Sequence, residues 1–282
     1  MLCRIGEVEV WRILEINGPF VEPEKLYPNA GPELHHILRE HAPGQLCEHS
    51  GKLILPIQGF LLKTPDHVIL VDACVGNDKT VKSLPDWNHR SDGRFMSALT
   101  AAGVAPADVD YVLCTHLHTD HIGWNTRLVD GRWVPTFPKA RYLIPAEDNH
   151  ADSADPTDSY TESVLPVIEA GQAEMVQPGH CLGDYVRLVP TPGHTPGHVS
   201  VLVHSGGAEV LITGDALHST AQCHRPDWHF AYDDNPELAV QSRVALLEDS
   251  SEVGRRVLGS HFTLPSIGRV RAVGDAFRWE PD

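Results

Sequence analysis

The sequence lacks an excess of positive charge. Its 282 residues contain 22 Lys and Arg against 38 Asp and Glu, which gives a formal net charge of −16 at pH 7. Recognition of nucleic acid requires a basic surface that neutralises phosphates, and binding to an anionic membrane surface requires basic clusters. The charge balance therefore argues against both kinds of partner.

Long apolar runs and a cysteine framework are also missing. No stretch approaches the roughly 20 apolar residues of a membrane-spanning helix. The N-terminus, MLCRIGEVEV, has no basic segment followed by an apolar one, as a secretory signal would have. The six cysteines form no CxxC pair. We therefore expect reduced thiols and a cytoplasmic protein.

The composition is that of a globular protein, with 41% hydrophobic and 21% charged residues. Two successive blocks of predicted strands, each followed by helices, favour a mixed α/β fold with four αββα layers over a doubly wound parallel sheet. The predicted strands cover 7–16, 53–63, 67–72, 110–116, 141–144, 185–191, 198–204 and 208–215. The predicted helices cover 93–103, 159–171 (interrupted by Pro166) and 236–248.

We expect one domain over residues 1–282. Residues 18–50 are rich in Pro, Gly and His and form an irregular segment, for which a cap and a dimerisation arm are the two interpretations.

The most informative segment is CTHLHTDH, residues 114–121. Residues i and i+2 of an extended segment point the same way, so His116 and His118 can reach one metal ion together. Asp120 and His121 follow as the chain turns, and they can face a second ion. Imidazole and carboxylate ligands suit a divalent metal such as zinc. A solvated polar loop is the alternative, but the spacing disfavours it even in a chain with 18 histidines.

Three later ligand-type residues each follow an apolar strand. His194 lies in TPGHTPGH, Asp215 in ITGD and His261 in GSH. Loops at strand ends are where binding sites are built, so these residues extend the candidate metal site.

The complete set resembles the metallo-β-lactamase-fold superfamily, whose pattern is HxHxDH followed by a distant His, an Asp and a His. The resemblance covers about residues 53–262 and implies the αββα sandwich. It also implies two divalent metal ions, for which zinc is the expected identity. The first would be bound by His116, His118 and His194, the second by Asp120, His121 and His261, and both by Asp215.

Two further residues have supporting roles under this resemblance. Asp72 resembles the family's strand-end Asp, which supports the metal loop, although an ordinary turn Asp is an equal alternative. His198 is the second His of GHTPGH, where the family pattern uses only the first as a ligand. We therefore expect His198 to be structural or to support a ligand.

Two such cations can share a water and lower its pKa toward neutrality, which predicts hydrolysis of an ester-like bond. Asp120 is expected to hydrogen-bond this nucleophile and to pass a proton to the leaving group. The segments GFLLKTPDHVILVDACVGND, THLHTDHIGWNT and GDALHSTAQ resemble the branch of quorum-quenching lactonases and methyl-parathion-hydrolase-like esterases. This branch implies a lactone or aryl ester substrate, with phosphotriesters as a promiscuous activity.

Three residues are candidates for the substrate pocket. His218 stands where acyl-homoserine-lactone lactonases usually carry Tyr, and it is expected either to contact a leaving oxygen or to be a satisfied loop histidine. Trp124 and Trp228 are expected to line an apolar pocket or to pack in the core.

The alternatives are a glyoxalase-II-like thioester hydrolase, a β-lactam hydrolase and a non-catalytic metal-binding protein. The expected partner is a small-molecule substrate, and a homodimer fits the lactonase resemblance.

Overall fold

The computed structural model describes residues 1–282, and the chain divides into two compact units. Unit 1 comprises Met1–Glu15 and Ile57–Gly183, and unit 2 comprises Ile16–Pro56 and Asp184–Asp282. Each unit is built around its own sheet. The single domain over residues 1–282 stays a prediction.

The sheet of unit 1 has the strand order β1-β2-β3-β4-β5-β8-β9. β1 pairs with β2 and β3 with β4 in antiparallel fashion, whereas β4, β5, β8 and β9 are parallel neighbours. The strands are β1 (Cys3–Ile5), β2 (Val8–Ile16), β3 (Ile57–Lys63), β4 (Val68–Val71), β5 (Tyr111–Leu113), β8 (Arg141–Pro145) and β9 (Ala173–Val176).

The parallel pairing of β4 with β5 determines where the first ligand group lies. Val71 is opposite Leu113 in the register, so both strands end at the same edge of the sheet. Asp72 therefore lies beside the start of the CTHLHTDH segment, and its backbone N–H donates to Leu113 O at 2.9 Å.

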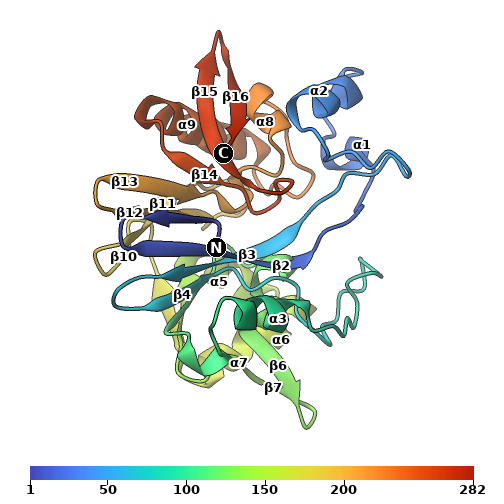
Figure 1. Cartoon of the computed structure of the whole chain (residues 1–282). Helices are drawn as coiled ribbons and strands as arrows, with labels where there is room; N and C mark the ends of the chain where they lie inside the picture. The colour runs from blue at the N-terminus through green and yellow to red at the C-terminus, as the bar shows by residue number, and fades with distance from the viewer. The chain divides into compact units, whose positions relative to one another are not determined.

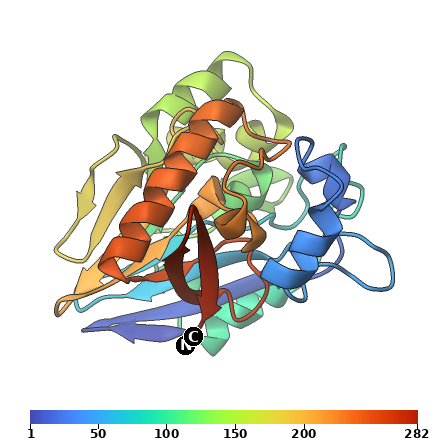
Figure 2. The same cartoon turned by 90° about the horizontal axis from the view of Figure 1, so that it is seen from above.

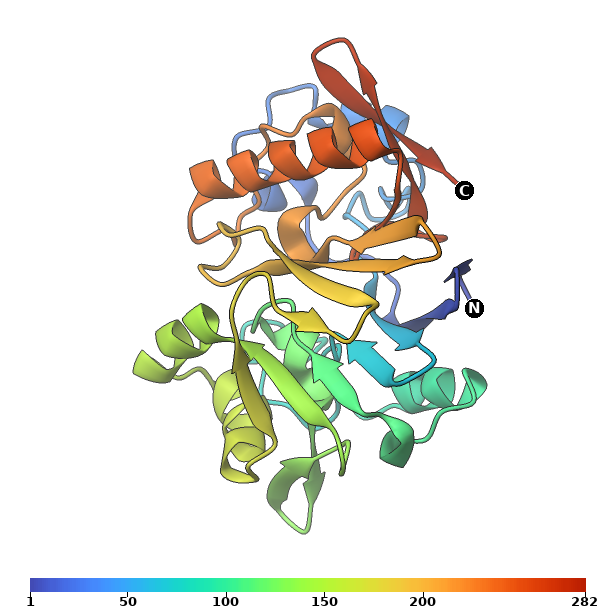
Figure 3. The ribbon, with the colours of Figure 1, turned by 90° about the vertical axis from the view of Figure 1, so that its left-hand side faces the viewer.

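The helices α3, α6 and α7 lie on one side of this sheet (Figures 1 and 3). Pro166 occupies the start of α7, where a missing N–H costs nothing, so the segment predicted as one interrupted helix forms two. The helices of unit 1 are α3 (Arg94–Ala101), η1 (Pro106–Asp108), α4 (Thr119–Ile122), η2 (Gly123–Asn125), α5 (Ala146–Ala154), α6 (Asp158–Ser163) and α7 (Leu165–Glu169). A separate hairpin is formed by β6 (Thr126–Val129) and β7 (Arg132–Pro135), and β10 (Cys181–Leu182) ends the unit.

In unit 2 the strands from β11 to β16 are consecutive neighbours in one sheet. β12 is antiparallel to both β11 and β13, and β13 is parallel to β14. The strands β11, β13 and β14 therefore run in the same direction, and their ends deliver His194, Asp215 and His261 to one edge. The strands are β11 (Val186–Pro190), β12 (Val199–Ser205), β13 (Ala208–Ile212), β14 (Arg256–Leu258), β15 (Ile267–Val273) and β16 (Ala276–Pro281).

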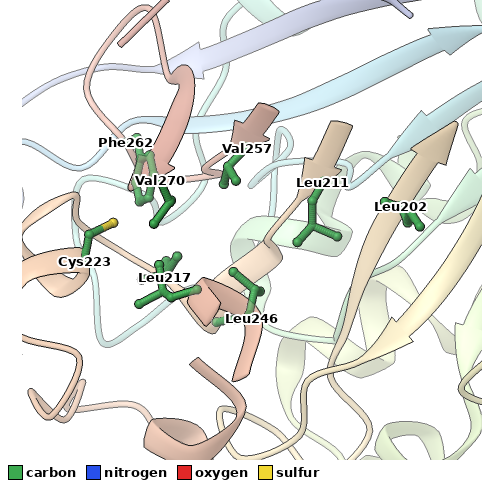
Figure 4. Packing of buried hydrophobic residues seen from close by; sticks show 10 residues of the cluster. Leu202, Leu211, Leu217, Cys223, Leu246, Val257, Phe262 and Val270 are labelled. Atoms are coloured by element: carbon green, nitrogen blue, oxygen red, sulfur yellow. The ribbon is translucent and has the colours of Figure 1, made fainter. Parts of the chain in front are cut away.

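The long helix α9 (Pro236–Val253) covers one face of this sheet (Figure 3). Asn235 caps its first turn by accepting from Leu238 N at 3.1 Å, and Gly254 ends it in the left-handed conformation. Leu246 and Leu247 of α9 join an apolar cluster with residues of the sheet and of the loops that follow it (Figure 4). Its other members are Leu202, Leu211, Ala216, Leu217, Cys223, Val257, Phe262 and Val270.

Residues 18–50 belong to unit 2 and are less irregular than predicted, since they contain α1 (Pro23–Leu26) and α2 (Leu34–His41). α2 lies beside α8 (Ala221–His224), and η3 (Gly214–Ala216) completes the helices of the unit (Figure 2). The roles of this segment as a cap or as a dimerisation arm stay predictions.

Two absences noted in the sequence recur in the structure. All six cysteines are free, as predicted. None of the helices combines the length and the apolar character that crossing a membrane requires.

A close approach of two backbones supports the edge of the unit 1 sheet. Gly123 N donates to Cys74 O at 2.7 Å, and Trp124 N donates to Ala73 O at 2.7 Å. A Cβ atom added at Gly123 would lie 1.8 Å from Val75 O, which no real structure tolerates. The segment after the HxHxDH motif thus requires a residue without a side chain.

We predict that Gly123→Ala destabilises the protein by about 3 kcal/mol or more, because backbone must move to admit the methyl group. The free energy of unfolding in urea measures this cost. Gly18→Ala is the matched control, since a Cβ at Gly18 has no atom within 4 Å. Equal stabilities of the two variants would contradict the predicted clash.

Candidate metal centre

The first group of ligand-type residues lies on the loop after β5 and on α4, in unit 1. His116 and His121 are fully buried, whereas His118 and Asp120 are partly exposed. The ring centroid of His116 is 4.7 Å from that of His118 and 4.0 Å from that of His121. The Nε2 atom of His121 lies 3.6 Å from a carboxylate oxygen of Asp120. Unit 1 therefore brings all four residues of the predicted motif together.

Asp72 fixes the orientation of this group. Its carboxylate accepts hydrogen bonds from Thr115 N at 2.8 Å, Thr115 Oγ1 at 2.9 Å and His121 Nδ1 at 2.9 Å. Because the Thr115 hydroxyl donates to Asp72, it must accept from His116 Nδ1, which is 3.1 Å away. Both imidazoles thus carry their proton on Nδ1 and present the Nε2 lone pair, the tautomer required for binding a metal through Nε2.

Glu15, on β2, supports the same loop, a role that no motif in the sequence indicates. Its buried carboxylate accepts from Val75 N at 2.8 Å and from Trp124 Nε1 at 2.7 Å. Burial raises the pKa of Glu15, and the two hydrogen bonds oppose that rise. The Trp124 ring stacks on Phe95 with centroids 5.1 Å apart. Trp124 is thus packed in the structure, and its contact with a substrate stays a prediction.

The second group lies in unit 2 and converges on Asp215. The Nε2 atoms of His194, His218 and His261 lie 3.3, 3.2 and 3.1 Å from its carboxylate oxygens. Ligand atoms of Asp215, His218 and His261 all lie within 4.8 Å of one another, close enough to hold a metal ion.

The imidazoles of His194 and His261 each make a hydrogen bond through Nδ1 to a group other than Asp215. His194 Nδ1 donates to Asp233 at 2.9 Å, and His261 Nδ1 donates to Pro56 O at 2.8 Å. In their neutral forms both rings would therefore turn an Nε2 lone pair toward the negative Asp215 carboxylate. Such a cluster is stable only with a proton or a cation between the acceptors, and imidazole and carboxylate are ligands that zinc accepts. The residues present thus fit a divalent metal ion.

The pKa of His194 shows the same demand for positive charge. Burial alone would lower this pKa, but the hydrogen bonds to Asp215 and Asp233 outweigh burial and raise it to about 9. In the metal-free protein a proton on His194 takes the place that a cation would fill.

His218 behaves differently. Burial lowers the pKa of His218 to about 3 despite the attraction of Asp215, so the ring is neutral and can donate its Nε2–H to that carboxylate. The ring stacks on Phe230 with centroids 3.4 Å apart. Trp228 is equally buried and lies against Tyr27. Contacts of His218 and Trp228 with a substrate stay predictions.

His198 supports Asp215. Its Nδ1 lies 2.8 Å from Thr191 Oγ1 and 3.0 Å from Thr191 O, and its Nε2 accepts from the backbone N–H of Asp215 at 2.9 Å. The Nε2 lone pair is therefore already used. This geometry agrees with the expectation that His198 is not itself a ligand.

Sequence reasoning missed Asp233 and Arg243. Asp233 accepts from Phe230 N at 2.9 Å in addition to His194, and Arg243 lies 3.7 Å from its carboxylate. Arg243 also donates from Nε to Ala216 O at 2.8 Å, next to Asp215. Both side chains are fully buried. Neither residue belongs to a recognisable motif, since Asp233 lies in a polar loop and Arg243 in the middle of a helix.

We predict that His194 makes the stability of the metal-free protein fall with pH. Its folded-state pKa of about 9 exceeds the ordinary histidine pKa of 6.5. The stabilisation is complete below pH 6.5 and disappears as the pH rises through 9, a change of roughly 3 kcal/mol. Urea unfolding of the chelator-treated protein between pH 6 and 10 measures it.

Lys79 has the opposite effect, because burial lowers its pKa to about 7 and stability then rises with pH. The comparison is therefore made with His194→Gln, in which the contribution of Lys79 is unchanged. Parallel pH profiles for the wild type and His194→Gln would contradict the prediction.

Comparisons with known proteins identify the family of the chain. Residues 55–261 match the metallo-beta-lactamase superfamily. An N-acyl homoserine lactonase from a Bacillus species is 31% identical over 225 residues, which cover 73% of this chain and 78% of the relative. An N-acyl homoserine lactonase from Bacillus thuringiensis is 31% identical over 212 residues, covering 70% and 78%.

Solved structures show the same fold. A hydrolase of the beta-lactamase superfamily, AbOPH, superposes with a TM-score of 0.83 at 24% identity, covering 99% of this chain and 96% of that one. AidC, described as a dizinc quorum-quenching lactonase, gives 0.78 at 21% identity with the same coverage. The resemblance and the fold predicted from the sequence are confirmed: the chain belongs to the metallo-beta-lactamase superfamily and has its fold.

Proposed function

We propose that this protein is a dinuclear metal hydrolase that cleaves the ester bond of a lactone or an aryl ester. The observation that carries the proposal is that the His194 and His261 rings face the Asp215 carboxylate, an arrangement that requires positive charge among buried acceptors. A non-catalytic metal-binding protein is the alternative that the hydrolysis screen below tests.

The proposed ligands are those of the family pattern. His116, His118 and His194 would hold one ion, Asp120, His121 and His261 the other, and Asp215 both, with zinc as the metal. This pairing of the two ligand groups rests on the pattern shared with the superfamily. When bound, two such ions would supply a water of lowered pKa and would polarise the carbonyl oxygen of the substrate.

The protein's own groups prepare this chemistry. Asp72 and Asp233 accept the Nδ1–H of His121 and His194, so that both rings present Nε2. Asp120, whose side chain is 13% exposed, can accept a proton from the attacking water and return it to the leaving oxygen. His218 is neutral at pH 7 and offers an N–H rather than a charge.

The substrate class follows from the relatives and from one departure. The relatives at 31% identity are named N-acyl homoserine lactonases. This chain has His218 where such lactonases usually carry Tyr, so we propose a lactone or aryl ester without restricting it to homoserine lactones, with phosphotriesters as a secondary activity. A small-molecule substrate, a homodimer and a cytoplasmic location complete the proposal.

A hydrolysis screen of the zinc-reconstituted protein tests the proposal. It contains lactones of several chain lengths, nitrophenyl esters, a phosphotriester, a β-lactam and a glutathione thioester. Preferred cleavage of lactones or aryl esters is the expected result. Preference for the thioester or the β-lactam would favour those alternatives instead. A protein that holds less than one metal ion per chain, even after reconstitution, would overturn the proposed metal-dependent hydrolase activity.

We predict that Asp120→Asn leaves folding intact and lowers kcat by about 100-fold or more, because an amide cannot take up the proton. Circular dichroism, metal content and kcat are measured together. Asp155→Asn, on an exposed loop, is the matched control. A fully active Asp120→Asn protein with its metals bound would exclude the proton-transfer role.

A further inference from the structure

A buried glutamine links two of the site histidines. Gln45 follows α2 and is 1% exposed. Its Nε2 donates to the backbone oxygen of His218 at 3.0 Å and to that of His261 at 3.4 Å. Its Oε1 accepts from Ser219 Oγ at 2.5 Å. The side-chain amide thus ties the loop after β13 to the loop after β14.

The two backbone carbonyls determine which way the amide points, because they can only accept hydrogen bonds, whereas the Ser219 hydroxyl can donate or accept. A hydroxyl that donates to Oε1 leaves the NH₂ group facing the two carbonyls, and the reverse orientation would place acceptors against each other. A second buried glutamine acts on the same residue, because Gln222 Oε1 accepts from His218 N at 2.7 Å. Both backbone groups of His218 are therefore held by glutamine side chains.

The segment that carries Gln45 also holds the ring of His261. Pro56 O accepts from His261 Nδ1 at 2.8 Å. Residues 45–56 thus fix His261 at its backbone oxygen and at its ring nitrogen, which leaves Nε2 directed at Asp215, 3.1 Å away.

We propose that Gln45 is a positioning residue of the metal centre, which sets the distance of His261 and His218 from Asp215. This inference rests on the proposed function. Metal sites tolerate errors of only about 0.2 Å in ligand distance, so loops that carry ligands must be held more tightly than ordinary loops. Residues that orient ligands typically change metal affinity by 10–100-fold when they are replaced.

The experiment compares Gln45→Met with Gln172→Met. Gln172 is a matched control in unit 1, because its Nε2 donates to the backbone oxygens of Phe137 at 3.1 Å and Ala140 at 2.8 Å and contacts no ligand residue. Zinc affinity is measured by competition with a chelator, and the d–d absorption of the cobalt-loaded protein reports the ligand geometry. Urea unfolding measures the general loss of stability in each variant.

We expect Gln45→Met to bind zinc on the order of 10–100-fold more weakly and to change the cobalt spectrum, whereas Gln172→Met changes neither. Ser219→Ala removes the hydroxyl that donates to Gln45 Oε1, together with the bond that this hydroxyl accepts from Ala221 N at 3.0 Å. It leaves the two bonds from Gln45 Nε2 in place, so it is expected to weaken zinc binding in the same direction by less. If Gln45→Met does not fold, the zinc affinity of Ser219→Ala tests the inference instead.

Wild-type zinc affinity in Gln45→Met, or in Ser219→Ala where the first variant does not fold, would overturn the inference. The proposed function fails by a different result, namely a wild-type protein that binds two zinc ions and hydrolyses nothing in the screen. The affinity measurement does not depend on turnover, so the two failures are distinguishable.

Discussion

The crowding of hydrogen-bond acceptors around Asp215 is the constraint on which the rest of unit 2 depends. His194 and His261 donate hydrogen bonds from Nδ1 to Asp233 and to Pro56 O. In the neutral rings the Nε2 lone pairs therefore face the Asp215 carboxylate. The free-energy cost of burying an uncompensated charge is larger than the free energy of unfolding of a typical domain. A proton or a cation must therefore lie between the Asp215 carboxylate and the two imidazoles. The surrounding residues hold these acceptors together.

Unit 1 meets a similar requirement by packing backbone against backbone. Asp72 orients His121 directly and His116 through Thr115, and it can do so because β4 and β5 end side by side. The turn after Asp72 then packs so tightly on Gly123 that no side chain fits there. Glu15 closes the arrangement by accepting from both sides of the contact. The candidate ligands His116 and His121 are thus held by the sheet edge and not by the loop alone.

The sequence predicts several of the strands, because a strand depends on a short-range pattern, and the candidate ligands rest on a local pattern of the same kind. The HxHxDH spacing and the apolar runs 110–116 and 208–215 are local signals, and the structure contains β5 and β13 within those runs. Strand boundaries shift inward, as in residues 53–56, which precede β3. The partners of the ligands were not predictable. Asp233, Gln45 and Glu15 lie far from the ligands in sequence, and only the fold brings them close.

These partners lie far from the candidate ligands in sequence, so a ligand motif alone does not define a metal site. His194 needs Asp233 to present its Nε2, and that same pairing raises the pKa of His194 to about 9 in the absence of metal. A metal ion bound by His194 would therefore have to displace a proton at neutral pH, and its affinity would fall as the pH falls. Holding the site together without metal and binding metal strongly are thus opposed demands. The buried carboxylates strengthen the binding of a proton and of a metal ion alike. Rigid geometry strengthens only the binding of the metal ion, which needs several ligands at fixed distances. Contacts that fix geometry without adding charge, such as the amide of Gln45, shift the balance toward the metal.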